Sequence, residues 1–295
     1  MIYYFYIILA MVIWSSLGVF IKISNLSVAT IVFYPSVISV LLQLPMFLSK
    51  RKRQEFPSLK RISLLGLVSL IVLANTYMFF LAYSLTTISN AVFTHYIAPV
   101  IVAALSPFFL KDRLHVSIFI SIAIATFGLW LILKDVSVID VITEGVSDKN
   151  LIGIISGLVS GVMYAVLVIV LKLYMGMYNR YIIIFLQNTF VSLFLLPFVS
   201  LPPRRYIWIL VVVGIFHSTI ANHLYYKGLE KVQACKAAIL GYIEPVGAVL
   251  FGIIFLSEEV NVFSLIGGTM IIISGYIVIR QKLDDTKCTP ASIQN

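Results

Sequence analysis

Charged residues are scarce in this chain: Asp, Glu, Lys and Arg make up 11% of its 295 residues, whereas a soluble domain contains about 25%. This shortage excludes a soluble enzyme, a disordered protein and a free nucleic-acid-binding domain, although the formal net charge is +9 at pH 7. The two cysteines, Cys235 and Cys288, are too few for a disulfide framework or a thiolate metal site. Since 61% of the residues are hydrophobic, the composition indicates an integral membrane protein.

Charge is also nearly absent from ten long apolar runs, each long enough to cross a bilayer as a helix, which takes about 20 residues. Nine runs contain no Asp, Glu, Lys or Arg, and the run 237–257 contains only Glu244. The alternation of apolar and polar residues that is typical of a membrane β-barrel is absent. We therefore predict an all-α integral membrane protein with ten transmembrane helices. These expected helices cover 3–21, 26–48, 62–83, 88–110, 114–133, 151–171, 181–203, 206–226, 237–257 and 261–279.

Lys and Arg are distributed unevenly between alternate loops, and such residues concentrate on the cytoplasmic side of a membrane. With the N-terminus in the cytoplasm, 16 of the 21 Lys and Arg residues lie inside and five lie outside. The first run lacks the basic leader and the cleavage site of a signal peptide, so we expect it to be retained. The predicted location is the inner (cytoplasmic) membrane of a prokaryote, with both termini in the cytoplasm, the lipid bilayer as partner and no nucleic acid.

Two segments repeat at an offset of 146 residues: Tyr96-Ile97-Ala98-Pro99-Val100 lies over Tyr242-Ile243-Glu244-Pro245-Val246, and 109–112 lies over 255–258. Each lies in the fourth helix of a five-helix half. Five helices end on the opposite side from their start, so the second copy must be inverted, as is typical of secondary transporters with a midplane site. We expect Pro99 and Pro245 to interrupt their helices and free carbonyl groups.

The predicted organisation follows from this repeat. We expect a first repeat at 1–133, an extracytoplasmic connection at 134–150, a second repeat at 151–280 and a polar cytoplasmic tail without regular structure at 281–295.

Several short motifs occur together in one order along the chain. They are Trp14-Ser15-Ser16-Leu17-Gly18, the two Tyr-Ile-x-Pro-Val segments, Asp112 and Glu258 at helix ends, and Gly128 and Gly275. In these motifs the chain resembles the EamA-like family of the drug/metabolite transporter superfamily. The resemblance implies ten helices, a central cavity between inverted repeats, and alternating access for small metabolites, with many members exporting amino acids. Members often carry an Arg near the start of the second helix, where this chain has Val32-Phe33-Tyr34-Pro35.

Glu244 is the leading candidate for a site residue, because an ionisable side chain inside a span is costly and usually functional. Two interpretations stay open: it couples protons or binds a substrate amine, or it bonds to backbone freed by Pro245. His95 lies one turn before Pro99. It could serve a proton relay or act as a packing residue.

The remaining candidates are polar or aromatic residues inside the expected helices, each able to contact a substrate or to bond another helix. They are Trp14, Ser15, Asn75, Tyr96, Tyr164, Gln187, His217, Asn222 and Tyr242. His217 and His223 are six residues apart and point about 120° from each other on a helix, which disfavours joint metal binding. We expect no metal and no cofactor.

We predict a secondary transporter of small organic metabolites, namely amino acids or related zwitterionic or cationic compounds, with export as the favoured direction. It is expected to act as a monomer or homodimer on a small-molecule substrate. The alternatives are a polytopic membrane enzyme or a transporter-derived sensor without transport activity. An enzyme is disfavoured because Glu244 is the only carboxylate deep in a span.

Overall fold

The computed structural model of the chain describes residues 1–24, 26–47, 57–86, 88–112, 114–133, 148–175, 177–256 and 262–287. These residues contain helices and no strand. Ten helical stretches are long and apolar enough to cross a membrane, which confirms the predicted all-α membrane architecture. Glu258, the basic cluster at 50–53, most of the expected connection (134–147) and 288–295 lie outside the described residues.

The helices divide several spans into shorter pieces. In chain order they are α1 (Ile2–Ser15), α2 (Leu17–Ser24), α3 (Val28–Phe47), α5 (Leu59–Leu85), α6 (Ile88–His95), α7 (Ala98–Phe109), α8 (Val116–Leu133), α10 (Asp148–Met175), α11 (Arg180–Leu195), η1 (Leu196–Phe198), η2 (Arg204–Tyr206), α12 (Ile207–Ile215), the π-helix η3 (Phe216–Ala221), α13 (Asn222–Leu229), α14 (Ala234–Leu240), α15 (Ile243–Leu256) and α16 (Val262–Lys287).

Both repeated segments break a helix inside a span. Residues 96–97 separate α6 from α7, and residues 241–242 separate α14 from α15. The breaks precede the prolines: Pro99 is the second residue of α7, and Pro245 is the third residue of α15. Because proline lacks an N–H and clashes with the turn before it, it fits the first turn of a new helix and ends the preceding one.

Helix α16 continues to Lys287, so 281–287 is helical rather than part of a tail without regular structure. The physical reason lies in its composition, since this stretch contains no Gly or Pro and begins with Gln281, Lys282 and Leu283, which favour helix.

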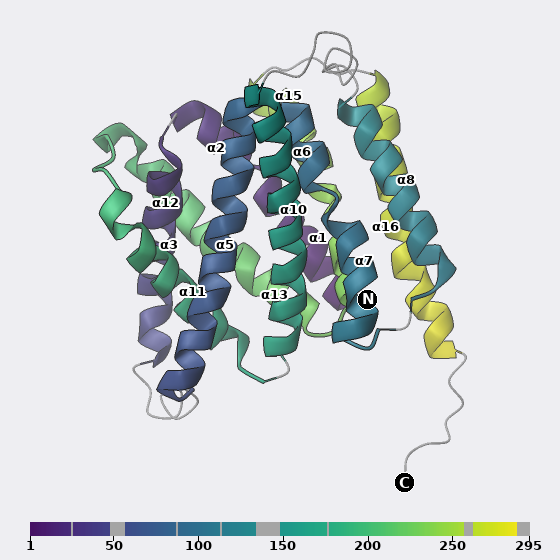
Figure 1. The fold of residues 1–295 in the computed structure, drawn as a ribbon, viewed down its shortest axis with the longest axis horizontal. Helices are drawn as coiled ribbons and strands as arrows, with labels where there is room; N and C mark the ends of the chain where they lie inside the picture. The colour runs from purple at the N-terminus through teal and green to yellow at the C-terminus, as the bar shows by residue number, and fades with distance from the viewer. Residues whose placement is uncertain are drawn as a thin grey trace.

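The two halves of the chain exchange their first helices. Helix α10, which opens the second half, packs along α5, α6 and α7 of the first half. Helix α1 in turn packs along α13, α14 and α15 of the second half. We call α5, α6, α7 and α10 unit A, and α1, α13, α14 and α15 unit B. Figure 1 shows α10 beside α5 and α6, with the pair α8 and α16 at one flank and α3 and α11 at the other. This arrangement is consistent with an inverted repeat.

The flanking pair α8 and α16 approaches closely through glycines. A Cβ atom built on Gly128 would lie 2.7 Å from the carbonyl oxygen of Gly267, and one built on Gly267 would collide with the carbonyl oxygen of Gly128. Small residues allow such backbone contact between membrane helices, where packing replaces the hydrophobic driving force. Gly268 is different, since its Cβ would meet only Val246 Cγ1 at 3.5 Å.

We therefore expect Gly267→Ala to lower the free energy of unfolding by about 1–3 kcal/mol, because the added methyl group must push two backbones apart. The neighbouring Gly268→Ala is the matched control and should cause no loss, since its methyl group fits. Thermal unfolding of both variants in one detergent checks this, and equal losses in the two variants would contradict it.

Candidate functional site

The two helix breaks lie against each other and join the halves of the chain. The rings of Tyr96 and Tyr242, which are equivalent in the repeat, have centroids 5.4 Å apart. The Tyr242 hydroxyl donates a hydrogen bond of 3.0 Å to the carbonyl oxygen of Tyr96 and lies 2.9 Å from Thr126 Oγ1. In a continuous helix the N–H of Val100 would bond to the carbonyl oxygen of Tyr96, but at the α6–α7 break it bonds to the carbonyl oxygen of Ile97 instead. The carbonyl oxygen of Tyr96 therefore accepts its hydrogen bond from Tyr242, the equivalent tyrosine of the other repeat.

Glu244 lies just after the second break, surrounded by tyrosines from both units. Tyr96 Oη donates a long hydrogen bond of 3.3 Å to Glu244 Oε2. The carboxylate also lies close enough to the hydroxyl groups of Tyr83, Tyr164 and Tyr225 for its charge to act on them. Glu244 is half-buried although it lies halfway along the span Ala234–Phe255. A carboxylate can accept about four hydrogen bonds, so most of the acceptor capacity of Glu244 stays available.

His95 is fixed on the other side of Tyr96 by a polar network. Its Nδ1 lies 2.9 Å from Ser160 Oγ, and Ser160 Oγ donates its proton to the carbonyl oxygen of Asn75 at 3.0 Å. His95 Nδ1 must therefore be the donor to Ser160, which leaves Nε2 of a neutral ring as an acceptor. The ring also lies 4.4 Å from Phe79 and 5.5 Å from Tyr164, between centroids.

Trp14 connects α1 to the π-helix η3. Its indole Nε1 donates to the carbonyl oxygen of His217 at 3.2 Å, and its ring lies 5.2 Å from that of Tyr225. Ser16 Oγ lies 3.1 Å from His217 Nε2. Because a π-helix shifts the backbone bonding pattern, carbonyl groups in and beside it become available to other helices. The indole of Trp14 uses one of them, next to the tyrosines that surround Glu244.

A match to a protein-family model identifies the class of protein that contains this site. A model of the EamA-like transporter family matches residues 1–134 and again residues 151–280. The chain belongs to the EamA-like transporter family. Members of this family are transporters, and the ten apolar helices make this chain a multi-pass membrane protein. The same family match favours a transporter over an enzyme.

Curated relatives and a solved structure resemble this EamA-like protein along most of its length. The "Uncharacterized transporter YxxF" of Bacillus subtilis (strain 168) is 26% identical over 273 residues, which cover 90% of this chain and 85% of that protein. An "Uncharacterized transporter" of Archaeoglobus fulgidus is 28% identical over 242 residues, covering 78% and 81%. A solved crystal structure superposes with a TM-score of 0.79 over 94% of this chain and 98% of its own, at 14% identity, which shows a shared fold.

The EamA-like fold gathers some of the candidates predicted from sequence and separates others. Six lie together around the helix breaks, and Trp14 joins them through Tyr225. These six are Glu244, Tyr96, Tyr242, His95, Asn75 and Tyr164.

The other candidates bond elsewhere. The ring of His217 contacts Ser16 Oγ through Nε2, and its carbonyl oxygen accepts the hydrogen bond from Trp14. Ser15 Oγ donates to Val12 in its own helix, and Asn222 Nδ2 donates to Ser218. Gln187 accepts a hydrogen bond from Tyr226.

Four residues of the EamA-like site escaped the sequence prediction: Phe79, Tyr83, Ser160 and Tyr225. The chain contains 16 Tyr and 20 Phe residues, so an aromatic residue inside a span does not stand out from its neighbours. Ser160 lies in α10, which meets Asn75 and His95 only because the halves exchange their first helices. Its position within α10 gives no indication of this contact.

Ser160 offers a test of the network. We expect Ser160→Ala to lower the free energy of unfolding by about 1–3 kcal/mol, because the carbonyl oxygen of Asn75 and the Nδ1 of His95, both in half-buried residues, lose their hydroxyl partner. Ser156→Ala is the matched control one turn earlier, since its buried hydroxyl bonds only to Ile152 in its own helix. Thermal unfolding in detergent compares the two, and a larger loss for Ser156→Ala would show that the network does not hold α10.

Proposed function

We propose that this protein is a secondary transporter of small organic solutes that carry an amino group, such as amino acids or related zwitterionic or cationic compounds, with export favoured. One observation carries the proposal: Glu244 lies halfway along a broken span, half-buried, and accepts one long hydrogen bond from Tyr96. A carboxylate with unused acceptor capacity suits an ammonium group, since charge-assisted hydrogen bonds are the stronger kind.

The tyrosines around Glu244 support the same class of solute. Aromatic ring faces attract cations, and tyrosines from α5, α10 and α13 surround the carboxylate together with Tyr96. The chain also has Val32-Phe33-Tyr34-Pro35 where members of its family often carry an Arg. A negative, aromatic site without that Arg favours amines over anionic solutes.

The geometry suggests how the site would exchange a solute. In the structure the Tyr96 hydroxyl donates a hydrogen bond to one carboxylate oxygen of Glu244. An incoming ammonium would displace this neutral donor, because its charged N–H groups bind the carboxylate more strongly. His95 Nε2, left as an acceptor by the Ser160 network, would offer a neutral partner for a second donor. Alternating access would then come from movement of unit A relative to unit B about this site.

The location belongs to the proposal as well. The excess of Lys and Arg in the loops on the side of the termini supports a cytoplasmic position for both termini in the inner membrane.

A ligand screen tests the site directly. We expect an amino-bearing solute, at about 100 times its dissociation constant, to stabilise the purified protein by about 2.7 kcal/mol and to raise its melting temperature. The matched control is the N-acetylated form of each hit, which lacks the ammonium and should give no shift. The same hit should give no shift with Glu244→Gln, which keeps the shape of the side chain and removes its charge.

Flux assays complete the test. A hit should exchange across proteoliposomes with the wild-type protein and not with Glu244→Gln, whereas a sensor without transport activity would show the melting shift and no flux. A shift that survives unchanged in Glu244→Gln would rule out Glu244 as the group that binds the amine.

A further inference from the structure

Units A and B meet at the end of the bundle where α7 ends and where the last turns of α16 lie (Figure 1). There α7 of unit A packs on α14 of unit B, and α10 also reaches α14. At the opposite end, the part of the chain that is described shows no comparable packing between α6 and α15, the equivalent pieces in the repeat. We call the end at which α7 packs on α14 the closed end.

Lys172 joins the two units at the closed end. It lies in the last turn of α10 in unit A. Its Nζ donates to the carbonyl oxygen of Leu229 (2.5 Å), the last residue of α13 in unit B, and to those of Glu230 (3.2 Å) and Val232 (2.7 Å) in the α13–α14 connection. The last carbonyl groups of a helix lack helical partners and carry partial negative charge. All three donors of one ammonium group thus bond to carbonyl oxygens at the end of α13 and in the connection that follows it.

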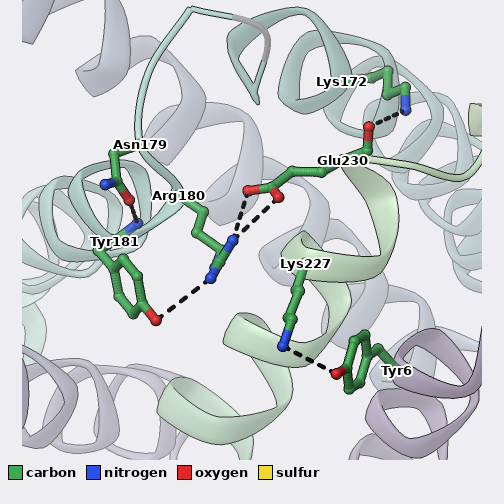
Figure 2. Close-up of polar contacts among 7 residues, drawn as sticks. All are labelled: Tyr6, Lys172, Asn179, Arg180, Tyr181, Lys227 and Glu230. Carbon is green, nitrogen blue, oxygen red and sulfur yellow. Dashed lines mark hydrogen bonds and ion pairs between the residues drawn. The ribbon is translucent and has the colours of Figure 1, made fainter. Parts of the chain in front are cut away.

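Two further side chains hold the same α13–α14 connection. Arg180 Nη1 donates to both carboxylate oxygens of Glu230 at 3.0 and 3.1 Å, as Figure 2 shows beside the Lys172 contact. Asp112, which follows α7, lies beside the backbone N–H of Ala234 at the start of α14. Burial raises the pKa of the Asp112 carboxyl above its ordinary value, because desolvation outweighs the attraction of Lys172 and Lys236.

We propose that Lys172 is the positioning residue of a gate at this end of the transporter, and that the gate opens when its ammonium leaves the three carbonyl groups. The proposal rests on the alternating access of the proposed function. Lysine suits the task because its partners are neutral carbonyl groups near the membrane surface, and water replaces such partners at small net cost. Two conformations can then stay within a few kcal/mol of each other, as alternation requires.

Lys227 provides a matched control in the same region. Its Nζ donates to Tyr6 Oη at 3.0 Å and lies 4.2 Å from the centre of that ring (Figure 2). Lys227 belongs to α13 and Tyr6 to α1, so both partners lie in unit B. Loss of this contact should leave the closure between the units unchanged.

The chain contains a natural probe of the closed end. Cys235 lies in α14, is 0% exposed and lies within electrostatic range of Asp112. The other cysteine is Cys288, so Cys288→Ser leaves Cys235 as the single thiol. A second probe, Ala248→Cys in a chain without other cysteines, reports on the opposite end, since Ala248 is exposed one turn beyond Glu244.

The test measures the rate at which a maleimide labels each probe in lipid nanodiscs. We expect Lys172→Met to speed labelling of Cys235 by about tenfold or more, a typical size for coupling between conformations. Labelling of Ala248→Cys should fall in the same variant, because one end closes as the other opens. Lys227→Met should change neither rate.

Three results would overturn the proposal: an unchanged Cys235 rate in Lys172→Met, an equal rise in Lys227→Met, or a rise at Cys235 without a fall at Ala248→Cys. If Lys172→Met does not give a monodisperse protein, Lys172→Gln, which keeps two N–H donors, should give the same pattern with smaller changes. Maleimide labelling needs no solute. Failure to find an amine substrate would therefore count against the proposed function but would not contradict the proposal that Lys172 positions a gate.

Discussion

The structure depends on one constraint: inside a bilayer, a backbone group released by a broken helix must find its partner within the protein, because lipid offers none. At the α6–α7 break the carbonyl of Tyr96 is taken by the Tyr242 hydroxyl from the other repeat. At the π-helix, the carbonyl groups of His217 and Ser218 are taken by Trp14 and Ser39. These partners come from other helices, so both of these irregularities also tie two helices together.

The position of Glu244 follows from this constraint. A carboxylate inside a span is tolerated in polar surroundings, and the tyrosines at the two breaks supply part of them. Tyr96 serves both purposes, since its carbonyl accepts from Tyr242 while its hydroxyl donates to Glu244. The bonds that stabilise the broken helices therefore also place the tyrosines around the one carboxylate of the spans.

Much of the fold could be predicted from sequence because hydropathy and proline act locally. The ten spans follow from apolar runs, and the two broken helices follow from Pro99 and Pro245, although the breaks lie two or three residues earlier. The grouping of Glu244, Tyr96 and Tyr242 was indicated by the repeat. The contacts of Ser160 and Lys172 could not be predicted from the sequence, because they arise where α10 packs against the other half of the chain. In the sequence Lys172 is one basic residue among 16 on its side of the membrane, and its three carbonyl partners lie 57 to 60 positions away.

The exchange of α1 and α10 between the halves also bears on how the protein is made. Membrane helices insert one by one and associate afterwards, and α1 is synthesised first while its partners in unit B come last. Trp14 and His217, which bond in the finished protein, are separated by 203 positions. Neither half can complete a unit alone, since unit A needs α10 and unit B needs α1. The two repeats resemble independent domains in sequence, yet unit A cannot be complete before α10 is made, and unit B cannot be complete before α15 is made.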